Sequence, residues 1–317
     1  MNWSRRWINP VLDKEFRLRM RSPKSMLSVM LYIFALGFVA MGFIYITMYV
    51  DNGGNQRFNS GMSQTMFYVL GFAQLLMIAF MAPALTAGVI SSEREKQTLS
   101  MLLTTQQSSA TIILSKLLSS LSFMALIVVA TMPVYSIVFL YGGISPQQVV
   151  YMFLFYLFIM ILLGSLGVMF STLFKRTMIS VIVTYGAGIF IFLITGLLYL
   201  FFLSMWQQQY GGPTPSSSGY SWVGYILGLN PAGAMLSIFD SSFSREMFYV
   251  YGSTMQADAP IQLWLEFVIV YSVVIILSLI ISIRKIRPVR RRKRNTSLEV
   301  ITEEMTMERV DTDLHDK

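Results

Sequence analysis

The segment Ser91–Lys116 reads SSEREKQTLSMLLTTQQSSATIILSK. It separates two apolar runs that are each long enough to cross a bilayer, and four consecutive charged residues, 93–96, stand near its start. Because a charged side chain in the middle of a membrane costs about 2.5–3.5 kcal/mol, a polar interruption of this kind marks a membrane edge. Ser92 and Glu95 have the spacing of a capping box, which predicts that a helix begins here.

Apolar residues then recur inside this segment at helical spacing, as Leu99, Leu102 and Leu103. The polar run 104–109 breaks the pattern, because short hydroxyl side chains compete for backbone hydrogen bonds. The segment therefore predicts a short amphipathic helix, a turn, and a second helix that enters the membrane near Ile112. For the stretch in isolation, an ordinary loop helix on the lipid headgroups is the simpler interpretation.

The composition excludes an ordinary soluble domain, since hydrophobic residues make up 55% of the 317 residues, charged residues 13%, and the mean hydropathy is +0.60. A helix needs about 20 apolar residues to span a bilayer. Six runs meet this length: Met26–Val50, Thr65–Ile90, Leu117–Tyr141, Val149–Phe174, Met178–Ser204 and Leu263–Ile283. The alternating strands of a membrane barrel are absent from the sequence. We therefore expect an all-α polytopic membrane protein with six transmembrane helices.

The distribution of basic residues predicts the orientation. With the N-terminus in the cytosol, only Arg57 and Arg245 of the 24 lysines and arginines lie on the outer side. Short cytosolic loops carry an excess of such residues, so both termini are predicted to be cytosolic. On this topology the segment Ser91–Lys116 is also cytosolic, and the predicted location is the cytoplasmic membrane.

Both ends of the chain are expected to lie at the membrane surface. Residues 1–25 form a predicted cytosolic amphipathic helix, with an apolar side toward the acyl boundary and a basic side toward anionic lipid. Residues 284–317 form a basic and then acidic cytosolic tail that flanks the transmembrane domain, 26–283. Nucleic-acid binding is a poor alternative for this tail, because no interleaved aromatics or folded scaffold follow. The predicted interface residues are Trp3, Trp7, Leu12, Phe16 and Met20 at the N-terminus and Arg290, Arg291 and Arg292 at the C-terminus.

The longest outer loop, 205–262, begins with a Gly-, Pro- and Ser-rich piece and becomes amphipathic from Tyr220 to Phe243. This pattern predicts helices that dip into the outer leaflet or cap the extracellular mouth. A seventh span is the alternative, against which the break at Asn230-Pro231 and the charge of Asp240 argue.

The residues exclude several kinds of chemistry. The chain has no cysteine and only one histidine, His315, so cysteine and histidine metal clusters are excluded. The predicted spans carry no ionisable residue except Glu266, close to the outer edge of the sixth, whereas proton- or sodium-coupled carriers keep such residues for their ion pathways. No run of the form GxxxxGK followed by Ser or Thr occurs, so any ATP hydrolysis requires another polypeptide.

Several motifs resemble those of the bacterial ABC-2 type permeases, the membrane subunits of ABC exporters. They are Glu93-Arg94-Glu95-Lys96-Gln97-Thr98-Leu99, Leu102-Leu103-Thr104-Thr105, Ile112 to Leu118, Asn9 to Glu15, and Leu229-Asn230-Pro231. The resemblance covers about residues 9–283. Two departures stand out, since Gln106-Gln107 replaces a common proline and Ser115 a common glycine.

The resemblance implies that Ser91–Lys116 is a coupling helix that docks in a groove of a separate P-loop ATPase. The implied coupling residues are Glu93, Arg94, Glu95, Thr98, Leu99, Leu102, Leu103, Thr104 and Thr105. The leucines supply a docking face, and the three charged residues, 93–95, could form ion pairs at its rim. The ATPase would bind ATP and Mg, so this chain is expected to be neither an enzyme nor a cofactor protein.

Six spans are half of the usual complement, so a second permease copy is implied, in a homodimer or a paralogous heterodimer. The implied function is alternating-access export of a lipid, peptide or other amphiphile. Two alternatives stay open from the residues alone. One is a non-transporting sensor or immunity protein for an antimicrobial peptide, and the other is a secondary carrier.

Overall fold

The computed structural model describes residues 23–50, 60–98, 108–210, 221–248 and 259–286, and every regular element in these ranges is a helix. Several predicted residues lie outside the described ranges. These are Trp3, Trp7, Leu12, Phe16 and Met20, then Leu99, Leu102, Leu103, Thr104 and Thr105, and finally Arg290, Arg291 and Arg292.

The predicted all-α polytopic architecture is confirmed, because six helical stretches in the described residues are long and apolar enough to cross a membrane. They are Ser25–Tyr49, Gly61–Glu95, Ser109–Phe139, Pro146–Leu173, Thr177–Gln208 and Leu263–Ile286. Their elements are α2 (Pro23–Tyr45) with the π-helix η2 (Ile46–Val50), α3 (Ser60–Thr86) with α4 (Ser91–Glu95), α6 (Ser109–Ala130) with α7 (Met132–Tyr141), α8 (Pro146–Leu173), α9 (Thr177–Ile189) with the π-helix η3 (Phe190–Ile194) and α10 (Thr195–Tyr210), and α14 (Leu263–Ile286).

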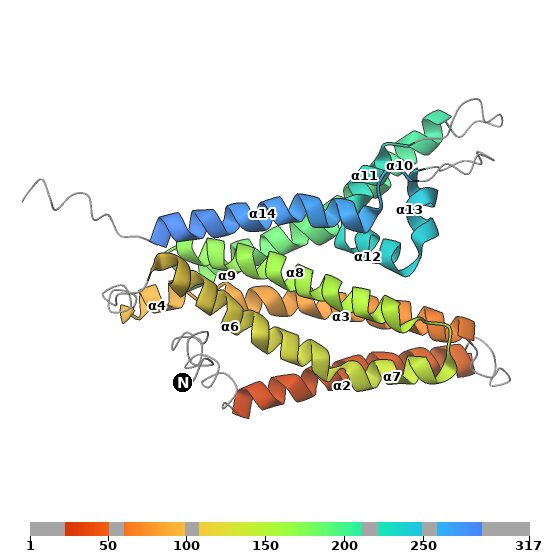
Figure 1. Cartoon of the computed structure of the whole chain (residues 1–317), viewed down its shortest axis with the longest axis horizontal. Helices are drawn as coiled ribbons and strands as arrows, with labels where there is room; N and C mark the ends of the chain where they lie inside the picture. The colour runs from red at the N-terminus through yellow and green to blue at the C-terminus, as the bar shows by residue number, and fades with distance from the viewer. Residues whose placement is uncertain (1–22, 51–59, 99–107, 211–220, 249–258, 287–317) are drawn as a thin grey trace, which may run out of the picture.

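Helix α8 lies at the centre of the bundle and packs against α3, α6, α9 and α14 (Figure 1). Its Tyr156 is fully buried and donates a hydrogen bond to the carbonyl oxygen of Gly71 in α3, at 2.8 Å. Near the other end of α8, a Cβ atom at Gly167 would lie 2.1 Å from the Oγ1 atom of Thr86. Only glycine allows α3 and α8 to approach this closely, as small residues commonly do between membrane helices.

The third and fifth spans are interrupted part-way along their length. The third breaks at Thr131, where α7 begins with a proline in its first turn, and proline cannot donate the backbone hydrogen bond that would continue α6. The Thr131 hydroxyl donates to the carbonyl oxygen of Val128 at 2.6 Å and lies 3.1 Å from Oε1 of Gln74. The fifth span contains the five-residue π-helix η3, whose wider turns disturb the regular backbone ladder.

Three short helices precede the last span: α11 (Val223–Gly228), α12 (Pro231–Phe239) and α13 (Ser241–Phe248). Each is too short to cross a bilayer, and the break predicted at Asn230 is present. We call the end of the bundle that carries α4 the α4 end (Figure 1).

Helices α11 and α12 lie within the length of the bundle, where exposed backbone groups would find no water (Figure 1). The Asn230 side chain therefore accepts from the N–H of Ala232 at 2.8 Å and donates to the carbonyl oxygen of Phe192 in η3 at 2.8 Å. The Tyr271 hydroxyl donates to the carbonyl oxygen of Leu229 at 2.9 Å. These hydrogen bonds satisfy backbone groups at the break between α11 and α12, and they attach the break to the fifth and sixth spans.

Candidate functional site

The short helix α4 begins the predicted coupling segment and follows α3 after a turn, 87–90. The predicted capping box at Ser92 and Glu95 is wrong: the N-cap is Ile90, in helical conformation, without a side-chain hydrogen bond. The reason is that the residues immediately before Ser92, Ile90 and Ser91, already have helical conformation, so its N–H group finds a backbone acceptor. The N–H of Ser92 donates to the carbonyl oxygen of Gly88 at 3.0 Å, so it needs no cap.

Side chains of α8 and α9 hold this turn from both sides. The hydroxyl oxygen of Ser171 in α8 accepts from the N–H groups of Ile90 and Ser91, each at 2.9 Å. The hydroxyl of Ser180 in α9 donates to the carbonyl oxygen of Ala87 at 2.7 Å. All of these groups are buried. The first and last residues of the turn are thus held by buried hydrogen bonds to α9 and α8.

Glu93 connects α4 to the third span. Its Oε1 atom lies 2.5 Å from Nζ of Lys116, in the second turn of α6. The Lys116 side chain is 5% exposed and that of Glu93 26%. A charge buried to this extent is stable only when it is paired, because leaving it alone costs several kcal/mol. The pair therefore joins the two ends of the predicted coupling segment.

Arg94 connects α4 to the end of α8. Its guanidinium group donates to the carbonyl oxygens of Thr172 at 3.2 Å and Phe174 at 3.3 Å. Helix α8 ends at Leu173, and the last carbonyl groups of a helix have no partner within it. A cation is also favourable at this position, because the C-terminus of a helix carries partial negative charge.

Glu95 connects α4 to the start of α9. Its carboxylate accepts from the N–H of Thr177 at 2.7 Å and from the Thr177 hydroxyl at 2.8 Å. Thr177 is the first residue of α9, whose N-cap residue, Arg176, makes no capping hydrogen bond with its own side chain. A residue about 80 positions earlier in the chain therefore supplies the cap and the negative charge that a helix N-terminus favours.

Three consecutive side chains thus hold three different spans, and we call Glu93, Arg94 and Glu95 with these partners the charge clamp. Beyond it the chain turns at Gln97, which has a positive φ of 58°. The hydroxyl of Thr98 donates back to the carbonyl oxygen of Glu93 at 3.2 Å. Of the implied coupling residues, these four are the ones the structure describes, and their role toward an ATPase stays a prediction.

Sequence reasoning missed the partners of the clamp. Lys116 entered only as a cytosolic charge and as part of a family motif, and Thr177 was not singled out. One signal was available, because Lys116 stands in an apolar helical run and a cation there usually needs a nearby acid. No comparable signal pointed to Thr177, since its contact with Glu95 depends on how the spans pack.

The face around the clamp carries exposed basic side chains. Lys96 follows α4, Lys175 and Arg176 lie between α8 and α9, and Arg284 and Lys285 are in the last turn of α14. The acids at this end among the described residues, Glu93 and Glu95, are both bound within the chain. Glu95 is itself exposed, so five exposed basic residues stand against one exposed acid, and the exposed charge of the described α4 end is positive in balance.

The sequence model of the family described as ABC-2 family transporter protein matches residues 9–284, a range that includes the whole charge clamp, the first five spans and the sixth as far as Arg284. The chain belongs to this family, which confirms the resemblance. Its members are membrane permease subunits of ABC transporters, are not themselves catalytic, and generally work with an ATPase subunit. A search of curated proteins found no match.

Proposed function

We propose that the chain is the permease subunit of an ATP-driven exporter, and that the loop between α4 and α6 docks on a separate P-loop ATPase that binds ATP and Mg. The observation that carries this proposal is the charge clamp. A docking segment transmits movement only if its base is attached to the spans, and Glu93, Arg94 and Glu95 attach it to α6, α8 and α9.

The contacts suggest how the movement passes on. The Glu93–Lys116 pair closes the base of the loop, so a push on the loop moves α4 and α6 together. Arg94 and Glu95 hold the end of α8 and the start of α9, and both helices must follow α4. Two copies of the permease, identical or paralogous, would then alternate between inward and outward access at the cytoplasmic membrane.

The same contacts bear on the chemistry of the docking face. Besides Glu95, whose carboxylate is bound by Thr177, the exposed charges near the loop are Lys96, Lys175 and Arg176. We therefore propose an acidic rim on the ATPase. Charge pairs at such a rim set orientation and association rate more than affinity, so docking should weaken as salt rises.

The proposed cargo is a lipid, peptide or other amphiphile. The support is the low charge of the spans, where the ion pathways of a secondary carrier would need ionisable residues.

The test separates docking from coupling. The permease is co-expressed with a candidate ATPase, purified in nanodiscs, and assayed for co-elution and for ATP hydrolysis stimulated by candidate amphiphiles. We expect Leu102→Asp to lose the ATPase. Arg94→Ala should keep the ATPase bound and lower the amphiphile-stimulated ATP hydrolysis at least tenfold, because the end of α8 is released from α4. Arg284→Ala, an exposed cation outside the clamp, is the control. Normal stimulation of ATP hydrolysis in Arg94→Ala would overturn the coupling role of the clamp. Retention of the ATPase by Leu102→Asp would overturn the docking role of the loop.

A further inference from the structure

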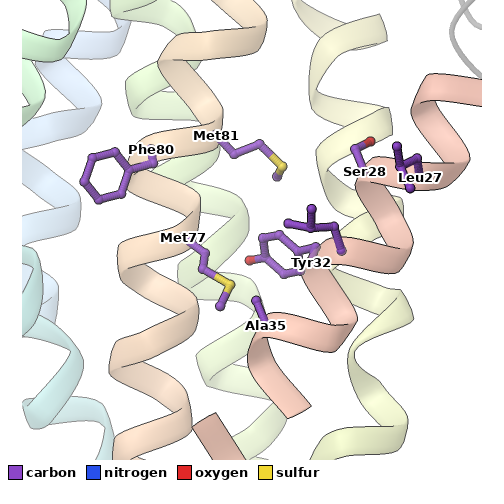
Figure 2. Close-up of a pocket in the computed structure, with 8 residues that line it drawn as sticks. Leu27, Ser28, Tyr32, Ala35, Met77, Phe80 and Met81 are labelled. Carbon is purple, nitrogen blue, oxygen red and sulfur yellow. The ribbon is translucent and has the colours of Figure 1, made fainter. Parts of the chain in front are cut away.

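A groove of about 540 Å³ runs between α2 and α3 on the outside of the bundle (Figure 2). Its size is in the range of small-molecule sites. The lining is apolar except for two hydroxyl groups, and consists of Leu27, Ser28, Leu31, Tyr32, Ala35, Met77, Phe80 and Met81. The rim residues Leu27, Leu31 and Phe80 are exposed, so the groove is open to the surroundings of the spans.

The groove lies in one leaflet. It uses the first half of α2 and the last third of α3, both at the α4 end. Tyr32 is seven residues beyond Ser25, the first residue of its candidate span, which corresponds to about 10 Å along the helix. Half of the hydrocarbon core measures about 15 Å. A molecule that enters the groove laterally at this depth therefore comes from the hydrocarbon region of the bilayer.

The floor of the groove holds a polar atom that lacks a partner. Tyr32 is 7% exposed, and its hydroxyl makes no hydrogen bond within the described residues. Figure 2 shows its ring projecting from α2 toward α3, with Met77 and Met81 projecting from α3 toward it. Phe123 and Ile127 of α6 pack with the ring.

An unsatisfied buried hydroxyl costs about 1–3 kcal/mol. Phenylalanine would fill the same space without that cost. By contrast, the buried hydroxyl of Tyr156 donates to a backbone carbonyl. The hydroxyl of Tyr135 also lacks a partner among the described residues, but Tyr32 is the one of the two that lines the groove. Its polar atom therefore points to an acceptor that enters from the groove.

We propose that this groove is the entry site of the exporter's cargo, an acyl-chain amphiphile that carries a hydrogen-bond acceptor. The acyl chain of the cargo lies along the groove from Leu27 to Ala35, and a carbonyl or hydroxyl oxygen of the cargo accepts a hydrogen bond from the Tyr32 hydroxyl. The two methionines adapt the groove to chains of different shape. An ordinary phospholipid keeps its carbonyl oxygens at the membrane boundary, so a hydroxyl at this depth selects amphiphiles that place an acceptor deeper. This inference rests on the proposed function.

The test uses the full chain in phosphatidylcholine nanodiscs without ATPase or nucleotide. Two photoactivatable probes are compared, a fatty acid with a mid-chain hydroxyl and the matched fatty acid without it, and labelled peptides are mapped by mass spectrometry. We expect labelling by the hydroxylated probe to concentrate on α2 and α3 and to fall at least fivefold in Ala35→Leu, which fills the groove. Ala84→Leu is the matched control, because Ala84 is exposed on α3 outside the groove.

Tyr32→Phe separates recognition from packing, since it removes only the oxygen. Tyr32→Phe should lower labelling by the hydroxylated probe to the level of the probe without the hydroxyl. Labelling by the probe without the hydroxyl should not change. Equal labelling of all lipid-facing helices, or equal response of both probes to Tyr32→Phe, would overturn the proposal. So would disulfide-linked dimers of Leu31→Cys, because the chain has no other cysteine and a second copy would then cover the groove. Since no ATPase is present, these outcomes are independent of the coupling test with Arg94→Ala.

Discussion

Glu93 and Lys116 form an ion pair of 2.5 Å that brings together two residues 23 positions apart. The pair closes the base of the segment between α4 and α6, and it places a buried cation on a helix that has no other charged residue. Both its position and its burial make the pair a structural requirement of the α4 end.

The first prediction concerns this pair. Lys116→Glu alone places two like charges together and leaves them poorly solvated, so we expect a loss of about 3–5 kcal/mol in the free energy of unfolding. The double variant Glu93→Lys with Lys116→Glu should recover at least half of it. The measurement is thermal unfolding in detergent, followed by tryptophan fluorescence.

The matched control for the ion pair is Lys175→Glu, an exposed cation at the same end. It should change the free energy of unfolding by less than about 1 kcal/mol, as exposed charges usually do. An equal loss in Lys175→Glu, or no recovery in the double variant, would show that net charge and not the pair matters.

The second prediction concerns the cap of α9. Glu95→Ala removes the acceptor of the Thr177 N–H and hydroxyl, so the first turn of α9 loses its cap. We expect hydrogen exchange in the first turn of α9 to be at least about twofold faster, because its first N–H group loses its side-chain acceptor. Glu246→Ala, in α13, is the control. Unchanged exchange at the start of α9 would contradict the cap.

The third prediction concerns the approach of α3 and α8. Gly167→Ala brings a Cβ atom to 2.1 Å from Oγ1 of Thr86, so the helices must separate, at a cost of about 1–3 kcal/mol. Gly186→Ala is the control, because a Cβ there meets no atom within 4 Å. That variant should be neutral or more stable by up to about 1 kcal/mol, since alanine favours the helix.

A second variant identifies the cause of the Gly167 effect. Thr86→Ala removes the Oγ1 atom that the new Cβ meets at 2.1 Å and keeps the Cβ atom at 2.9 Å, so Gly167→Ala with Thr86→Ala should recover part of the stability that Gly167→Ala loses. If the double variant loses the sum of the two single losses, the two sites are independent and the close contact is not the reason.

The fourth prediction concerns the break between α11 and α12. Asn230→Ala removes the cap of α12 and the bond to Phe192, so we expect a loss of about 2–4 kcal/mol and faster proteolysis after Leu229. Tyr271→Phe removes one bond to the same break and should cost about 1 kcal/mol. Ser204→Ala, whose hydroxyl bonds only within its own helix, is the control. Equal effects of the three variants would argue against a specific role of the break.

Much of the architecture could be predicted because its causes are local. A span requires a certain length of apolar sequence, and all six runs recognised in the sequence correspond to helices, although α3 begins at Ser60 and α6 at Ser109, before the predicted starts. The break at Asn230-Pro231 follows from the backbone rules of the residues themselves. The interruption at Thr131 and the π-helix η3 were not predicted, because the apolar pattern continues through both.

The candidate site was predicted only in part. The sequence placed the charged cluster 93–96 at a membrane edge, and the family motifs implied a functional role for it. It also predicted a capping box, which is wrong because Glu95 caps a different helix. Local spacing could not reveal this, since the competing partner, Thr177, is 82 residues away.

The sequence by itself determined that this protein is a six-span, all-α membrane protein of the ABC-2 family, because apolar length and short motifs are properties of contiguous residues. Only the tertiary structure decided what the cluster 93–95 does within the chain. Each of its charges is held by a residue of a different span, and those residues meet only after α6, α8 and α9 have packed together.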